Sequence, residues 1–203
     1  HIIKQATDYY TVLKTEHHSI SDGWSSPILF TSLHEHYRAL TSKGRTTLKE
    51  DTAYPRAQDY INDSKATVEA HWDNTLAEVE EANDINAMLS KPIDLASYRQ
   101  VERPRTNHLD IKGEAYDRLK TFSLREGLTV NVIVQFAWHK LLQAYSGNTQ
   151  SIVGTTVSGR DLPIEGIENS VGLFINTLPL VIDWDNNDPV KDQLKQVQKR
   201  ITA

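Results

Sequence analysis

The segment His17-His18-Ser19-Ile20-Ser21-Asp22-Gly23 is the most informative stretch of this sequence. The alternating run Tyr9 to His18 leads into it and predicts a β-strand. Ser26 and Pro27 follow, and they predict a helix start with Ser26 as N-cap and Pro27 in the first turn. A strand that runs into a tight polar turn and then a helix often presents a side chain in a cleft. We therefore expect this turn to carry the function of the protein.

The two adjacent histidines are predicted to have different roles, because consecutive side chains of a strand point to opposite faces. We expect His18 to face a solvent-connected cavity and His17 to be packed and hydrogen-bonded. An imidazole titrates near neutrality, so a histidine held in a cleft is a ready general base. The positive end of the following helix would favour its neutral, proton-accepting form. The residue types alone leave a second interpretation open, in which two histidines end a strand before an Asx-type turn.

Asp22 and Gly23 are candidates for shaping the turn. Asp22 can brace it through backbone amides or through a cation from elsewhere in the chain, and Gly23 permits a backbone geometry that a side chain would block. A metal site is a weaker prediction, because adjacent histidines on opposite strand faces cannot both bind one ion. The nucleophile elbow G-x-S-x-G is also a weak match, since Pro27 stands in place of its last glycine and Ser25 or Ser26 is better explained as a helix cap.

The composition describes an ordinary globular protein. The 203 residues are 38% hydrophobic and 24% charged, and the net charge of -5 argues against nucleic acid as the main partner. The absence of cysteine excludes disulfides and thiolate metal sites and fits a reducing compartment. The longest apolar stretch, Val132 to Trp138, is too short to span a bilayer. The chain begins at His1 rather than Met, so targeting by an N-terminal signal cannot be judged.

Hydrophobic periodicity predicts an α/β fold with mixed α+β sheets. The predicted strands cover His1–Lys4, Tyr9–His18, Thr106–Lys112, Ser151–Val157 and Leu173–Trp184, the last two as central strands. The predicted helices cover Pro27 to before Gly44, Ser64–Ala82, a stretch ending at Gly127, a stretch capped by Thr129 or Asn131 and stopped by Gly147, and a last helix opened by Asp188-Pro189. Polar or irregular connections are predicted over Thr41–Asp63 and Asn83–Pro104.

Three segments in order give the sequence a resemblance to a known family. His17 to Ser25 resembles the signature HHxxxDG followed by W-S. Ile152 to Arg160 is similar to a VG-x-x-V-x-x-R segment, and Asn169 to Pro179 to a GxFxNTLP segment. The family is that of condensation domains of nonribosomal peptide synthetases, within the two-lobed chloramphenicol-acetyltransferase-like fold.

The resemblance implies a division of the chain that covers only part of the family domain. Residues 1–45 would form the end of the N-terminal lobe, 46–105 a connector with one helix, and 106–203 an incomplete C-terminal lobe. We expect such a fragment to be inactive alone.

The resemblance also implies an acyltransferase. Two peptidyl carrier proteins, with an adenylation domain as neighbour, deliver substrates on 4'-phosphopantetheine, and the acceptor amine attacks the donor thioester. His18 and Gly23 would be catalytic, and His17 and Asp22 structural, with Asp22 paired to an arginine of the first lobe outside this chain. Arg160 and Asn176 are candidates for lining the tunnel or its bridging elements. No bound cofactor, metal, nucleic acid or membrane is implied, and a cytoplasmic location in a bacterium is expected.

Three rival functions share the fold. An epimerization domain would invert an α-carbon and need a second acid–base group. A silent member that recruits carrier proteins or enzymes usually has a degraded signature, and a stand-alone acyltransferase typically has a single-histidine HxxxDG.

Overall fold

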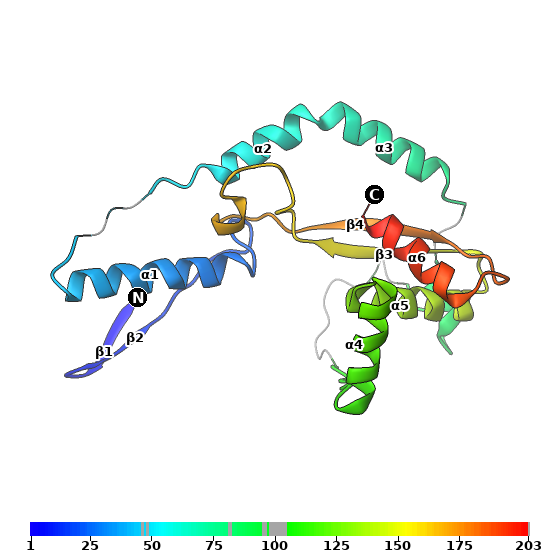
Figure 1. Cartoon of the computed structure of the whole chain (residues 1–203), viewed down its shortest axis with the longest axis horizontal. Helices are drawn as coiled ribbons and strands as arrows, with labels where there is room; N and C mark the ends of the chain where they lie inside the picture. The colour runs from blue at the N-terminus through cyan, green and yellow to red at the C-terminus, as the bar shows by residue number, and fades with distance from the viewer. Residues whose placement is uncertain (46, 48, 81–82, 95–96, 98–104, 203) are drawn as a thin grey trace. The chain divides into compact units, whose positions relative to one another are not determined.

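The structure is a computed structural model that describes residues 1–45, 47, 49–80, 83–94, 97 and 105–202 (Figure 1). Its contacts divide the chain into two compact units. The first unit contains residues 1–70 and 156–177, and the second contains residues 71–155 and 178–203. Both units are therefore built from segments far apart in the sequence. The three-part division predicted from the resemblance stays a prediction.

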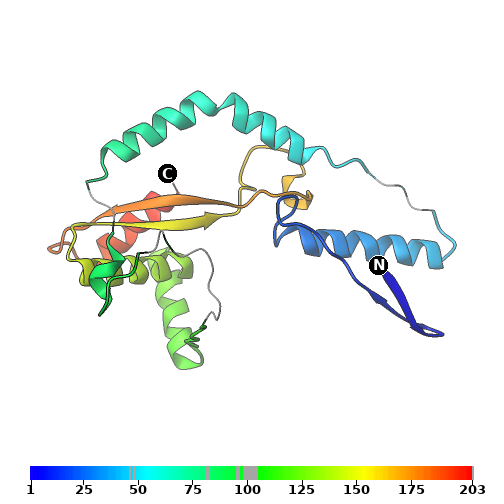
Figure 2. The same ribbon diagram turned by 180° about the vertical axis from the view of Figure 1, so that it is seen from behind.

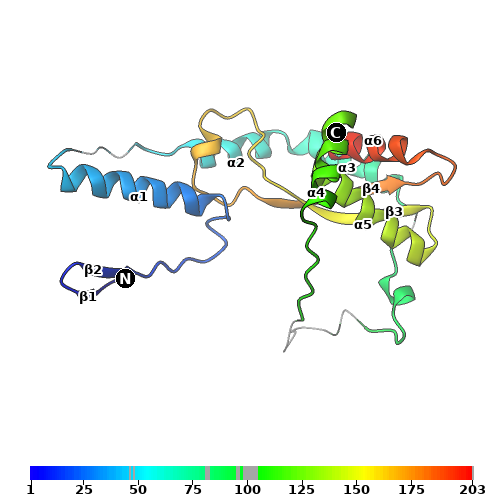
Figure 3. The ribbon, with the colours of Figure 1, turned by 60° about the horizontal axis from the view of Figure 1, so that its bottom comes forward.

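The first unit begins with a hairpin of the first two predicted strands. Strands β1 (Ile2–Ala6) and β2 (Tyr9–Val12) pair antiparallel, with Ile2 opposite Val12. The prediction that β2 continues to His18 is wrong. The His1 and Leu13 backbones pair beyond Ile2 and Val12, and among the described residues no strand continues this pairing past Leu13. Figure 3 shows that an irregular stretch instead leads from β2 to the next helix.

Helix α1 (Ser25–Thr41) confirms the predicted helix. Because the helix begins at Ser25, Ser26 lies inside it and is not the N-cap. Helix α2 (Ala53–Asp63) corrects the prediction of a polar connector over Thr41–Asp63. Its buried face consists only of Ala53 and Ala57, which gives too little apolar periodicity to be recognised. Helix α3 (Lys65–Ala77) confirms the next helix but ends before Ala82, which lies outside the described residues.

The second unit contains α4 (Glu114–Glu126), α5 (Val130–Ser146), α6 (Val190–Ile201) and a short 3₁₀ helix over Ile85–Met88. It also contains most of β3 (Gln150–Val157) and of β4 (Asn176–Asp183), whose residues 156–157 and 176–177 belong to the first unit. The sheet is two-stranded, and β3 and β4 lie side by side in Figure 2. Its core is formed by residues of the α4–α5 turn, α5, β4 and α6, namely Leu128, Val132, Leu180, Ile182, Trp184, Leu194 and Val197. The Trp184 amide donates to the Thr149 carbonyl at 2.7 Å, so the end of β4 lies beside the start of β3 and the strands run antiparallel.

Local signals in this unit are confirmed. Gly127 and Gly147 end α4 and α5 in the left-handed conformation, and the Thr129 hydroxyl accepts from the Val132 amide. Two predictions are wrong. Thr106–Lys112 is not a strand, because no described segment pairs with it, and Leu109 is 88% exposed. The strands predicted to be central each have one partner in the described residues.

Within the described residues, no helix has the length and apolar character needed to cross a lipid bilayer.

Candidate active site

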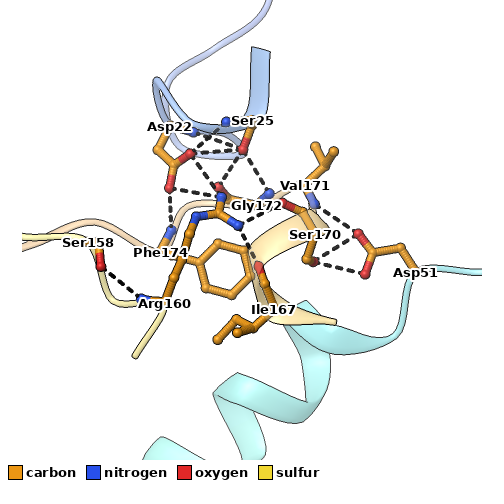
Figure 4. A network of polar contacts seen from close by, with 10 residues as sticks. All are labelled: Asp22, Ser25, Asp51, Ser158, Arg160, Ile167, Ser170, Val171, Gly172 and Phe174. Carbon is orange, nitrogen blue, oxygen red and sulfur yellow. Dashed lines mark hydrogen bonds and ion pairs between the residues drawn. The ribbon is translucent and has the colours of Figure 1, made fainter. Parts of the chain in front are cut away.

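The Asp22 carboxylate is the centre of a buried polar network in the first unit (Figure 4). Its side chain is inaccessible to solvent. Oδ1 accepts hydrogen bonds from the Ser25 amide and the Ser25 hydroxyl, both at 2.9 Å, and Oδ2 accepts from the Phe174 amide at 3.1 Å. These bonds join the end of the signature turn, residues 17–23, to the first residue of α1 and to Phe174, 152 residues later. Asp22 therefore braces the turn, as the sequence predicted.

Arg160 supplies the cation of this network. Its Nη2 donates to Asp22 Oδ1 at 3.1 Å, and the Arg160 side chain is 5% exposed. Its Nη1 donates to the carbonyls of Ile167 at 2.7 Å and Ser170 at 2.8 Å. A buried ion pair is tolerated when further hydrogen bonds satisfy both partners, and this pair has them on both sides. The pair therefore joins residues 138 positions apart within one unit.

The protonation state of Asp22 follows from these contacts. Burial disfavours the charged form and by itself would raise the pKa of Asp22. Hydrogen bonds from the Phe174 amide, from the Ser25 hydroxyl and amide, and from Arg160 outweigh burial and hold the pKa below its usual value. Asp22 is therefore ionised at neutral pH, which suits a structural anion and not a proton donor.

Two local features place Arg160 against Asp22. Gly159 has a φ of +65°, and a Cβ there would overlap the Phe174 carbonyl oxygen, so this position requires glycine. The Arg160 guanidinium carbon lies 4.1 Å from the centre of the Phe174 ring, a cation–π contact. Phe174 packs in a small core with Ala57 and Ile167. The glycine and this core together fix the direction of the guanidinium.

This arrangement corrects two expectations. The partner of Asp22 is Arg160, in the C-terminal part of the chain, and not an arginine of the first lobe. The resemblance implies that Arg160 lines the tunnel or its bridging elements, whereas its guanidinium is buried and paired. The sequence does not mark which of its arginines approaches a given carboxylate, because such a contact depends on the fold.

Ser25 is a site residue that sequence reasoning treated only as a helix cap. It is fully buried, and its hydroxyl lies 2.9 Å from the Gly172 carbonyl oxygen and accepts from the Gly172 amide at 3.1 Å. A buried hydroxyl with these partners is a structural junction and no exposed nucleophile. The signal that could have found it is its position three residues after Asp22, the spacing at which a side-chain oxygen meets a backbone amide in a capping turn.

The histidines lie outside the strand, so strand alternation does not apply to them. Both are exposed. The Ser19 amide donates to His17 Nδ1 at 3.2 Å, and the Ser19 hydroxyl lies 2.7 Å from the same atom. Nδ1 is therefore an acceptor, and neutral His17 has its proton on Nε2. His17 is hydrogen-bonded as expected, but the expectation that it is packed is wrong. His18 is open to solvent, and its role stays a prediction.

Gly23 and Asn176 are exposed. Gly23 has no positive φ, and a Cβ there would meet nothing within 4 Å, so the described residues give no steric reason for this glycine. Asn176 opens β4, and its Oδ1 accepts from the Thr177 amide at 2.8 Å. Among the described residues, no three His, Asp or Glu side chains gather in a way that could hold a metal ion.

The model of the condensation domain family matches residues 1–203. The chain belongs to the condensation domain family. This matches the resemblance of its three motifs to condensation domains of nonribosomal peptide synthetases, and the turn described above carries the family signature.

Curated relatives of this condensation domain are very large synthases. It is 37% identical over 211 residues to the N-(5-amino-5-carboxypentanoyl)-L-cysteinyl-D-valine synthase of Penicillium rubens, covering 100% of this chain and 6% of that protein. It is 30% identical over 203 residues to bacitracin synthase 3 of Bacillus licheniformis, covering 98% of this chain and 3% of that protein. The chain thus matches a small part of each of these two synthases.

Solved structures show the same fold. The first condensation domain of the calcium-dependent antibiotic synthetase, bound to a substrate analogue, matches with a TM-score of 0.65 and 18% identity over 92% of this chain and 42% of that one. The epimerization domain of the third module of tyrocidine synthetase B matches with a TM-score of 0.65 and 16% identity over 92% and 43%. The fold is therefore the chloramphenicol-acetyltransferase-like one. This chain spans about two-fifths of each matched structure.

Proposed function

We propose that this condensation domain takes part in forming the peptide bond between a donor acyl or peptidyl thioester and the amine of an acceptor aminoacyl thioester. The observation that carries the proposal is the intact signature turn, whose buried Asp22 binds both other motif segments, through Arg160 of the second and the Phe174 amide of the third. The Asp22–Arg160 pair fixes the position of Asp22, which lies in the same turn as the exposed His18 and Gly23.

His18 is proposed to act on the attacking amine. The amine nitrogen bonds to the donor carbonyl carbon, the carbon–sulfur bond breaks, and the donor thiol leaves, while the amine gives up a proton. A free α-amine has a pKa of about 8, so little force is needed to supply its neutral form. His18 therefore positions the amine and accepts its proton as it becomes cationic during attack. Positioning alone can lower a barrier by about 7 kcal/mol in favourable cases.

The neighbouring residues are proposed to support this step. The Gly23 amide makes no hydrogen bond within the described residues, and it would donate to the donor carbonyl as negative charge develops on its oxygen. Asp22 and His17 are proposed to be structural, Asp22 through Arg160 and His17 through Ser19. Asn176 remains a candidate for the tunnel wall, because it is exposed at the start of β4.

The proposed partners are donor and acceptor peptidyl carrier proteins that bear the substrates on 4'-phosphopantetheine, with an adenylation domain as a neighbour in the same synthetase. The chain spans only a few per cent of its curated relatives, so these partners come from the context in which such domains occur. A cytoplasmic, bacterial protein is the corresponding proposal for location and source.

The experiment is a donor–acceptor assay with loaded carrier proteins, using the synthetase that contains this domain. His18→Ala should abolish or strongly reduce peptide-bond formation while both carrier proteins still load and bind. His34→Ala is the matched control, because His34 is an exposed histidine of α1.

Other outcomes separate the alternatives. Inversion of the donor α-carbon without bond formation would identify an epimerization domain, and binding of carrier proteins without either reaction would identify a recruiting member. An unchanged rate for every acceptor in His18→Ala would overturn the role given to this histidine. The 203 residues alone are expected not to catalyse condensation, because the tunnel of such domains is lined from two lobes and this chain covers 42% of a solved condensation domain.

A further inference from the structure

We infer that Asp51 is a positioning residue for the signature turn, acting through segment 170–174 on Ser25 and Asp22. The inference rests on the proposed function and extends it to a residue outside all three motifs. Asp51 lies just before α2, in a stretch that the sequence predicted to be a plain connector.

Segment 170–174 is irregular, and side chains hold its backbone in place of a strand partner. The Val171 amide donates to Asp51, both polar groups of Gly172 meet the Ser25 hydroxyl, and the Phe174 amide donates to Asp22. Figure 4 shows these anchors along one short stretch of chain. The position of the segment is therefore set by a carboxylate at each end and a hydroxyl between them.

Asp51 holds the first end with three contacts. Its carboxylate accepts from the Ser170 hydroxyl and from the Val171 amide, each at 2.8 Å. It also accepts from the Ala53 amide, the first amide of α2, at 3.1 Å. Ser170 is 1% exposed, whereas Asp51 itself is exposed. A change at Asp51 therefore releases a buried segment without opening a cavity in the core.

The effect reaches the signature turn through Arg160. The Ser170 carbonyl is one of two carbonyls that accept from Arg160 Nη1, and Arg160 Nη2 holds Asp22. If Ser170 shifts, Arg160 loses an acceptor and the anchors at Gly172 and Phe174 are strained together. The turn that bears His18 then loses part of its fixed support, so the geometry of attack becomes less well defined.

The experiment compares Asp51→Ala with Glu50→Ala in the synthetase that contains this domain. The two changes remove the same charge from adjacent exposed residues, and Glu50 makes no hydrogen bond or ion pair within the part of the chain that the structure describes. With saturating loaded carrier proteins, Asp51→Ala should lower kcat about tenfold. This is less than the roughly 100-fold loss for a displacement of about 1 Å, because Ser25 and Asp22 still hold the rest of the segment. Glu50→Ala should leave kcat unchanged, and neither variant should alter loading.

Two further variants test the route. Asp51→Asn keeps one side-chain oxygen and should give an intermediate kcat, and Ser170→Ala should lower kcat with Asp51 intact. Ser25→Ala already removes the Gly172 anchor of segment 170–174. Adding Asp51→Ala to that variant should therefore lower kcat little further. A fully multiplicative loss in that background would contradict action through the segment.

Hydrogen exchange gives a readout that does not depend on activity. Asp51→Ala should speed exchange of the Val171, Gly172 and Phe174 amides, and Glu50→Ala should not. If the parent condenses and Asp51→Ala matches Glu50→Ala in both kcat and exchange, the inference is overturned and the proposed function stands. If the parent does not condense, the proposed function is overturned, and the exchange comparison alone decides whether Asp51 positions the segment.

Discussion

The two units bury polar groups in opposite ways. In the first unit, Asp22 and Arg160 form a charged pair. In the second unit, the buried polar network is neutral and consists of His139, Ser151 and Trp184. His139 and Ser151 are fully buried, and His139 Nδ1 lies 2.7 Å from Ser151 Oγ. Trp184 Nε1 donates to the same oxygen at 2.7 Å. The first network joins loops that carry the signature, and the second joins α5 to the sheet.

Protons weaken both networks, because the pKa values of Asp22 and His139 are both lowered, but the two side chains carry different charges at neutral pH. A lowered pKa keeps Asp22 ionised, whereas burial lowers the pKa of His139 to about 4 and keeps it neutral. The charged pair Asp22–Arg160 thus holds irregular segments that have no strand partner among the described residues. The neutral His139–Ser151–Trp184 network lies where helices and strands already hydrogen-bond the backbone. In this protein, the buried ion pair therefore stabilises the irregular segments around the signature turn, where backbone pairing is absent among the described residues.

The largest expected effect is that of Asp22→Ala. The variant leaves the buried Arg160 guanidinium without its anion, which costs about 3–5 kcal/mol of unfolding free energy. Urea unfolding of the purified protein at pH 7 measures it. A variant with normal stability and a purely kinetic defect would show that Asp22 acts in the chemistry instead.

The next effect is a pH dependence that comes from His139. Its folded pKa of about 4 lies below the unfolded value of 6.5, so the unfolded state binds more protons between these limits. The contribution to stability is complete above pH 6.5 and is lost as the pH falls to 4, a change on the order of 3 kcal/mol. Urea unfolding across this range should show the slope, and His139→Leu should remove it.

The Asp22 network should stay intact across that pH range. The pKa of Asp22 is below 3.8 when folded, so its contribution is lost only as the pH falls below about 4. A slope between pH 6.5 and 4 that persists in His139→Leu but disappears in Asp22→Ala would reverse the comparison.

Ser151→Ala should have a smaller effect. It leaves the Trp184 N–H and His139 Nδ1 without their shared partner, at a cost of about 2 kcal/mol. Adding Trp184→Phe removes one stranded group and should recover part of the loss. Equal stability of the single and double variants in thermal unfolding would contradict the network.

Arg200→Ala should have the smallest effect. Arg200 pairs with Glu78 at 3.5 Å and with Asp183 at 3.2 Å, and all three side chains are more than a third exposed. Such surface pairs contribute about 1 kcal/mol or less. A loss as large as that of Asp22→Ala would show that burial does not separate the strong pairs of this protein from the weak ones.

The sequence predicted what local chemistry determines. The ends of α4 and α5 at Gly127 and Gly147 and the start of α6 after Asp188-Pro189 depend on neighbouring residues alone. Helix α2 was missed because alanines form its buried face. Its signals were present in retrospect: Asp51 before the helix and Pro55 in its first turn.

The candidate site was only partly predictable for a related reason. The signature turn is continuous in sequence, so His17, His18, Asp22 and Gly23 could be named. The Asp22–Arg160 pair and the Ser25–Gly172 contact link residues 138 and 147 positions apart, and no periodicity records such a contact. Gly159 shows the same limit, since its need for glycine comes from the distant Phe174 backbone.

The central claim is that the Asp22–Arg160 pair fixes the signature turn as a structural unit, and a double-mutant cycle tests it most directly. Asp22→Ala, Arg160→Met and the double variant are compared by urea unfolding at pH 7. The double variant leaves no buried charge, so it should be less destabilised than the sum of the single variants by about 2 kcal/mol or more. Effects that add to within about 0.5 kcal/mol would contradict the account, because independent sites behave in that way.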